Sequence, residues 1–185
     1  MAQSKPAFPY LALLRGINVG GRNKLAMKDL SRLFIEAGCS DVRTYIQSGN
    51  VLFNAPGSAV RRIPEHVAES TAGEIGSRIP VVLRTFEELG DVIRNNPFLA
   101  EGLPRQTLHV SFLAATPAEG AVAALDPNRS APDRFLVQGR EIYLQMPNGM
   151  ARTKLTSAYF DSRLATIGTA RNWNTVLQLH ALMQG

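Results

Sequence analysis

The chain has 185 residues, 45% of them hydrophobic, and carries a formal net charge of +5 at pH 7. This length and composition predict one large or two small globular domains with a buried core, and no apolar run approaches the roughly 20 residues of a membrane span. Because Cys39 is the only cysteine, no disulfide can form within the chain, and a reducing cytoplasm is the expected location.

The first half of the chain predicts the order strand, helix, strand, strand, helix, strand. The apolar run 10–14 is typical of a buried strand, and residues 27–37 show a helical pattern that ends at Gly38. The remaining predicted elements are strands over 42–46 and 51–53 that form a hairpin, a helix over about 60–77 with its regular part after Pro64, and a strand over 81–84.

The second half predicts a similar order of strand, helix, two strands, helix, with no repeat of residues between the halves. Two capping boxes, Thr85–Glu88 and Thr116–Glu119, predict helix starts. The other predicted elements are a strand over 107–113, strands over 134–138 and 141–146 joined by Gly139-Arg140, and helices over 155–164 and 172–183.

Together the halves predict an α+β protein made of two ferredoxin-like (βαββαβ-type) modules packed together. The N-terminal module is expected over residues 1–85. The C-terminal module, with terminal helices, is expected over residues 86–185.

The segment 15–24 is the first candidate binding site, because it combines glycines and cations between a predicted strand and a predicted helix. Backbone N–H groups in such a turn and the positive end of a helix dipole favour an anion. The spacing of Gly16 and Gly21 fits a P-loop, but Arg22-Asn23 stands where that motif needs Lys followed by Ser or Thr. The dinucleotide fingerprint is not found either. The candidate anion-binding residues here are Arg15, Asn18, Gly20, Gly21 and Lys24; the alternative is a plain glycine-rich connection with solvated cations.

A second candidate is the Ser48-Gly49-Asn50 corner of the predicted hairpin. Ser48 and Asn50 are expected to point short polar groups at a ligand; the alternative is that these residue types only serve a tight turn.

The third candidate lies near the C-terminal end of the chain. Lys154 precedes one predicted helix, and Thr169 is expected to cap the last one, which would place Arg171 and Asn172 in its first turn. A bound anion would offset the conflict between Arg171 and the helix dipole. The alternative is that Trp173 anchors the helix in the core and Arg171 forms a salt bridge.

The positive charge is concentrated in two distant segments. Residues 15–43 hold six cations and three anions, and residues 150–185 hold four cations and one anion. If these segments meet in space, they form one basic surface that attracts polyanions or phosphorylated ligands.

Three runs of residues resemble the bacterial family called domain of unknown function 1697. They are LRGINVGG at 14–21, RTYIQSGNV at 43–51 and TARNWNT at 169–175, and Met27, Lys154 and Leu155 fit the same pattern. The resemblance spans nearly the whole chain. It implies an α+β fold of ferredoxin-like topology and a cytoplasmic bacterial protein, and it supplies no activity, substrate or catalytic residues.

The chemistry of the residues favours binding of a phosphorylated small molecule or nucleotide at the basic glycine-rich loop. No catalytic residues, cofactor or metal site are assigned, because His66, His109 and His180 lack the paired spacing of metal ligands and Cys39 follows a predicted helix C-terminus. The alternatives are an enzyme acting on a phosphorylated metabolite, and a nucleic-acid-binding or protein-interaction module. With aromatics at only 7% of the chain, stacking platforms for a nucleic acid are scarce.

Overall fold

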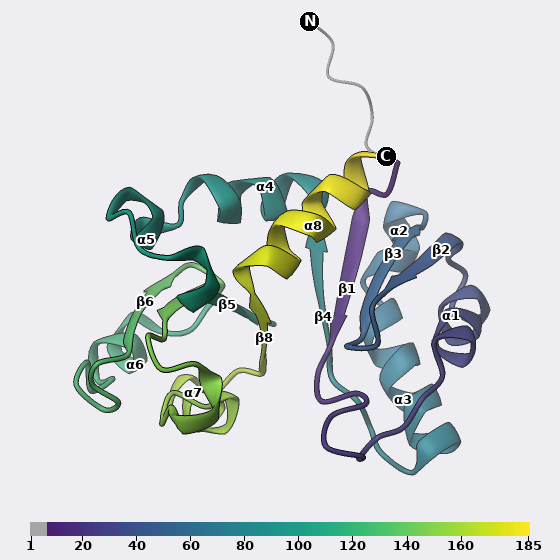
Figure 1. Cartoon of the computed structure of the whole chain (residues 1–185). Coiled ribbons are helices and arrows are strands. Elements are labelled where there is room, and N and C mark those ends of the chain that lie inside the picture. The colour runs from purple at the N-terminus through teal and green to yellow at the C-terminus, as the bar shows by residue number, and fades with distance from the viewer. Residues whose placement is uncertain (1–6) are drawn as a thin grey trace, which may run out of the picture. The chain divides into compact units, whose positions relative to one another are not determined.

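The strands form two four-stranded antiparallel sheets, each with helices of its own (Figure 1). The computed structural model describes residues 7–185. The chain divides into unit 1, residues 7–89 with 179–185, and unit 2, residues 90–178. It passes from unit 1 to unit 2 within α4 (Phe86–Arg94) and returns within α8 (Trp173–Gln184). The prediction of an α+β chain is confirmed.

Unit 1 has its strands in the order β2-β3-β1-β4. Its further elements are β1 (Tyr10–Leu14), α1 (Met27–Glu36), β2 (Ser40–Tyr45), β3 (Asn50–Asn54), α2 (Gly57–Val60), α3 (Ile63–Ile75) and β4 (Val81–Thr85). The single helix predicted over about 60–77 is thus two helices. Pro64 lies in the first turn of α3, where its missing N–H costs no helix hydrogen bond.

Unit 2 has its strands in the order β6-β7-β5-β8. Its elements are α5 (Pro97–Ala100), η1 (Arg105–Thr107), β5 (Leu108–Leu113), α6 (Glu119–Ala123), β6 (Arg134–Gln138), β7 (Glu141–Gln145), η2 (Met150–Arg152), α7 (Ser157–Leu164) and β8 (Gly168–Asn172). β8 is absent from the predicted elements. It pairs with β5 and forms one edge of the sheet.

One of the two predicted capping boxes forms. At the start of α4 the Glu88 backbone N–H donates to Thr85 Oγ1 at 3.1 Å, and the Thr85 N–H donates to Glu88 Oε2 at 2.8 Å. The box predicted at Thr116–Glu119 is wrong: α6 begins only at Glu119, and its N-cap Ala118 has no side-chain acceptor.

The two sheets contain equivalent backbone hydrogen bonds at the ends of their first strands. The Leu14 N–H donates to Gly49 O, as the Leu113 N–H donates to Arg140 O, both at 2.8 Å. The register also places two buried arginines alike, with Arg84 opposite Leu11 and Arg171 opposite Val110. Each guanidinium donates to the carbonyl of the preceding residue. The two halves therefore share one backbone arrangement, although their amino-acid sequences show no repeat.

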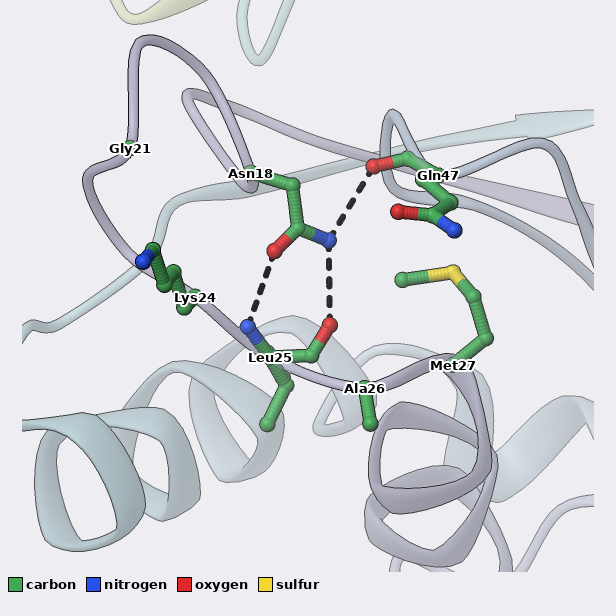
Figure 2. Close-up of a pocket in the computed structure, with 7 residues that line it drawn as sticks. All are labelled: Asn18, Gly21, Lys24, Leu25, Ala26, Met27 and Gln47. Carbon is green, nitrogen blue, oxygen red and sulfur yellow. Dashed lines mark hydrogen bonds between the residues drawn. The ribbon is translucent and has the colours of Figure 1, made fainter.

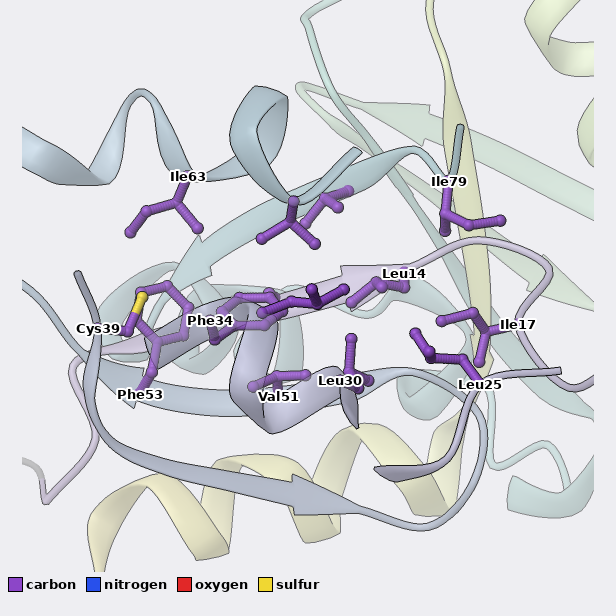
Figure 3. Close-up of a cluster of buried hydrophobic side chains, with 14 residues drawn as sticks. Leu14, Ile17, Leu25, Leu30, Phe34, Cys39, Val51, Phe53, Ile63 and Ile79 are labelled. Carbon is purple, nitrogen blue, oxygen red and sulfur yellow. The ribbon is translucent and has the colours of Figure 1, made fainter. Parts of the chain in front are cut away.

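The core of unit 1 lies between its sheet and the helices α1 and α3. Figure 3 shows apolar side chains from these elements packed together, with the Phe34 and Phe53 rings 5.4 Å apart. Cys39 lies in this cluster, and burial raises the pKa of its thiol to about 11. The thiol is therefore protonated near neutral pH and a poor nucleophile.

A second cluster, built on β7, α7 and neighbouring residues, forms the core of unit 2. Within residues 7–185, no helix is both long and apolar enough to cross a membrane.

Gly49 is the glycine whose missing side chain matters most to unit 1. Its φ is +74°, and a Cβ there would lie 2.8 Å from Leu14 Cβ. We expect Gly49→Ala to lower the free energy of unfolding by about 2 kcal/mol or more, because the left-handed conformation and a clash with Leu14 Cβ both oppose the methyl group.

Gly139→Ala is the matched control. This hairpin glycine also has a positive φ, +59°, but a Cβ would meet only the end of the flexible Glu141 side chain, at 3.8 Å. It should cost about 1 kcal/mol. Urea denaturation measures both, and equal losses would contradict the packing argument.

We expect the protein to lose stability at mildly acidic pH because His109 is buried in its neutral form. Its Nδ1 is buried with no hydrogen-bond partner in the described structure, and burial lowers its pKa although a hydrogen bond with the Thr107 backbone opposes the shift. The folded protein therefore keeps His109 neutral, whereas the unfolded chain takes up a proton below about pH 6.5. The free energy of unfolding should decline as pH falls through that value.

Denaturation at several pH values between 7.5 and 5.5 measures this decline. His109→Gln should reduce it, and His66→Gln, on an exposed residue of α3, should leave it unchanged. The same decline in all three proteins would exclude His109 as its source.

Candidate functional site

A cavity of about 570 Å³ lies in unit 1 beside the N-terminus of α1. This volume falls within the range of small-molecule sites. Two segments far apart in sequence form it, the connection from β1 to α1 and the turn between β2 and β3 (Figure 2). Its lining residues are Asn18, Gly21, Lys24, Leu25, Ala26, Met27 and Gln47.

The glycines of the β1–α1 connection form a turn. Val19 and Arg22 make an antiparallel bridge, and the Arg22 N–H donates to Val19 O at 3.0 Å. Between them Gly20 and Gly21 have φ values of +57° and +77°. Two successive positive φ angles are what a type I′ turn requires, which explains both glycines without a ligand. Of the two, Gly21 lines the cavity and Gly20 does not.

Asn18 joins the two segments that form the cavity. Its Nδ2 donates to the carbonyls of Leu25 at 3.0 Å and of Gln47 at 3.1 Å, and its Oδ1 accepts from the Leu25 N–H at 2.9 Å. Both amide hydrogens are thus committed inside the protein. Asn18 lines the cavity and holds its two walls together. Its role in binding a ligand stays a prediction.

Lys24 supplies the positive charge of the cavity. It is exposed, and no side chain in residues 7–185 forms an ion pair with it. α1 begins three residues later, and its N-cap Ala26 offers no side-chain acceptor to the first N–H groups of the helix. An anion in the cavity would therefore meet a lysine and an uncapped helix start together. Arg15 lies just after β1 and is not among the lining residues.

Asn50 and Ser48 hold the turn between β2 and β3. Asn50 is fully buried, and its Nδ2 donates to Tyr45 O at 3.1 Å and to Ser48 Oγ at 2.9 Å. These contacts correspond to the tight-turn alternative. The expectation that Asn50 presents its side chain to a ligand is not supported by this burial.

Lys154 lies in unit 2, on an exposed segment before α7. Its N–H donates to Ser130 Oγ at 2.9 Å, and its carbonyl accepts from Arg129 Nε at 3.2 Å, so its backbone is fixed. That Lys154 and Lys24 share one basic surface stays a prediction.

The predicted start of the last helix needs correction. Thr169 and Arg171 are strand residues of β8, and α8 begins at Trp173. Asn172 is the capping side chain instead, since its Oδ1 accepts from the Thr175 N–H at 2.8 Å.

Arg171 is buried, and its Nη1 donates at 2.9 Å to Thr169 Oγ1 and to Ala170 O. Burial also lowers the pKa of its guanidinium to about 10. Arg171 therefore helps to build the sheet and does not offer a cation at a helix start.

Four lining residues, Leu25, Ala26, Met27 and Gln47, are not among the predicted site residues. Gln47 stands beside the Ser48 corner, and Met27 begins the predicted helix over 27–37 and fits the family pattern. In residues 7–185, no three or more His, Cys, Asp or Glu side chains are grouped closely enough to hold a metal ion.

Comparisons with known proteins identify the fold and the family. A conserved bacterial protein from Streptococcus pneumoniae has a similar structure, with a TM-score of 0.66 and 23% sequence identity over 95% of this chain and 98% of that one. A search of curated proteins gave no match. The model of the family described as "Protein of unknown function (DUF1697)" matches residues 8–143, and the chain belongs to that family.

Proposed function

We propose that unit 1 binds a phosphorylated small molecule or nucleotide in the cavity beside α1. Lys24 and the first N–H groups of α1 would receive the phosphate, and Asn18 would keep the walls of the cavity together. Helix N-termini commonly bind phosphate, because their N–H groups lack partners and the helix dipole favours negative charge. Asp29, in the first turn of α1, is not among the lining residues.

This proposal rests on a difference in length between corresponding connections of the two units, whose sheets have the same strand order. In unit 2, residues 114–118 are enough to join β5 to α6, whereas unit 1 uses residues 15–26 between β1 and α1. Two residues join β6 to β7, whereas residues 46–49 join β2 to β3. Both longer connections line the cavity. Because the fold does not need the extra length, a binding role accounts for it.

The lining also distinguishes among the alternative functions. It holds one cation and no aromatic ring, which suits a small anion better than a nucleic-acid strand that needs charge and stacking along its length. It holds no carboxylate, histidine, cysteine or serine side chain to act as a base or nucleophile. Binding is therefore proposed ahead of catalysis.

The proposal extends to the architecture and location of the protein. We propose that both units are ferredoxin-like, because each has the element order βαββαβ and places its first strand between its third and fourth strands. The proposed boundary between residues 85 and 86 lies four residues before the division into units at residues 89 and 90. A cytoplasmic location is proposed from the single cysteine.

Lys24→Met tests the site directly. A charge-assisted hydrogen bond to phosphate contributes about 1.5–3 kcal/mol, so the variant should bind phosphorylated compounds at least about tenfold more weakly. Calorimetric titration with inorganic phosphate, sugar phosphates and nucleoside monophosphates measures this. Lys28→Met is the control, because Lys28 is exposed in α1 but does not line the cavity. Equal binding by both variants, or no binding by the unaltered protein, would contradict the proposal.

Salt dependence separates a small ligand from a nucleic acid. With one phosphate neutralised, affinity should fall only about three- to fourfold between 50 and 200 mM salt, whereas a strand held by six or more phosphates would lose about a thousandfold. Titrations of a mononucleotide and of short oligonucleotides at both salt concentrations measure the difference. Tighter and steeply salt-dependent oligonucleotide binding would favour the nucleic-acid alternative.

A further inference from the structure

The two ends of the cavity differ in chemistry. Figure 2 shows the Lys24 ammonium on one side of Asn18, and Gln47 and Met27 on the other. Asn18, between them, already donates both of its amide hydrogens to the carbonyls of Leu25 and Gln47. The polar side-chain donors that remain for a ligand are therefore the Lys24 ammonium and the Gln47 carboxamide.

Gln47 is held in place through its backbone. Its carbonyl accepts from Asn18 Nδ2 at 3.1 Å, and the residue before it, Ile46, has a φ of +48°. A β-branched residue rarely adopts this left-handed conformation. Ile46 is also 50% exposed, so burial of its side chain does not explain the conformation. The backbone thus turns at an unfavourable residue immediately before the one that lines the cavity.

The side chain of Gln47 is exposed, and it makes no hydrogen bond to another residue in the part of the chain that the structure describes. A carboxamide carries a donor and an acceptor side by side in one plane, which is the pattern that the edge of a nucleobase offers in return. Met27 lines the same end, and its flexible thioether packs well against flat rings. A sugar phosphate has hydroxyl groups but no flat edge with this pattern.

We infer that the ligand is a nucleoside monophosphate, with its phosphate at Lys24 and its base between Gln47 and Met27. The inference rests on the proposed function, since it assumes a phosphate in the same cavity. It adds that Gln47 determines the preference for a base.

The experiment compares three ligand classes by calorimetric titration. The probes are the four ribonucleoside 5′-monophosphates, ribose 5-phosphate and inorganic phosphate. At least one nucleotide should bind about tenfold or more tightly than ribose 5-phosphate, because a base adds contacts that the sugar lacks. This comparison uses the unaltered protein and does not depend on any variant.

Gln47→Met keeps the size of the side chain and removes its hydrogen bonds. It should bring nucleotide affinity to within about threefold of ribose 5-phosphate and leave the affinity for inorganic phosphate unchanged. Gln138→Met, on an exposed residue of β6 in unit 2, should behave like the unaltered protein. Thermal denaturation checks that the variants are folded.

The possible failures are distinct. If ribose 5-phosphate binds as tightly as every nucleotide, the nucleotide inference is wrong while the phosphate site stands. If Gln47→Met keeps the full preference for a nucleotide, Gln47 does not read the base. If none of the probes binds, the proposed function and this inference both fail.

Discussion

The carboxamide of Asn18 is the interaction on which the cavity depends. It connects residues that are 29 positions apart, because its Nδ2 in the β1–α1 connection donates to the Gln47 carbonyl in the turn between β2 and β3. The φ of Asn18 is +53°, a conformation that asparagine tolerates better than most residues. One residue therefore provides both the turn of the backbone and three hydrogen bonds. The position of Lys24 follows, because Leu25 beside it is fixed at its N–H and its carbonyl.

The backbone hydrogen bonds that both sheets share are needed for folding, whereas a segment found in only one unit is available for function. Gly49 and Arg140 accept equivalent hydrogen bonds from the ends of β1 and β5, so the strands need this geometry in both units. The long β1–α1 connection has no such counterpart, and its internal order comes from its own small hairpin. Function in such folds commonly resides in connections that a rigid sheet positions. In unit 2 the corresponding connection, residues 114–118 between β5 and α6, has only five residues.

Much of the fold could be predicted from local pattern, and the failures have identifiable causes. The apolar run of β1 and the Thr85–Glu88 box are local signals, and the structure confirms both. β8 was missed because Gly168–Asn172 lacks apolar alternation and is stabilised by pairing with β5. Its threonine also resembled a cap, although Asn172 performs that role. At the site, Asn18 and Lys24 were predicted, whereas Gln47 depends on the left-handed Ile46, which no sequence pattern indicates.

Charge counted along a sequence differs from charge available to a ligand, and Arg171 shows why. It contributes to the positive excess of residues 150–185, yet it is buried, and its guanidinium bonds to Thr169 and Ala170. Arg84 occupies the same place in the other sheet and is 1% exposed. Both arginines are thus structural parts of their sheets. A polyanion would meet fewer cations than the net charge of +5 suggests, whereas a single phosphate needs only Lys24 and a helix start. The burial of these two arginines and the single cation of the cavity lining therefore both support the proposal of a small ligand over that of a polymer.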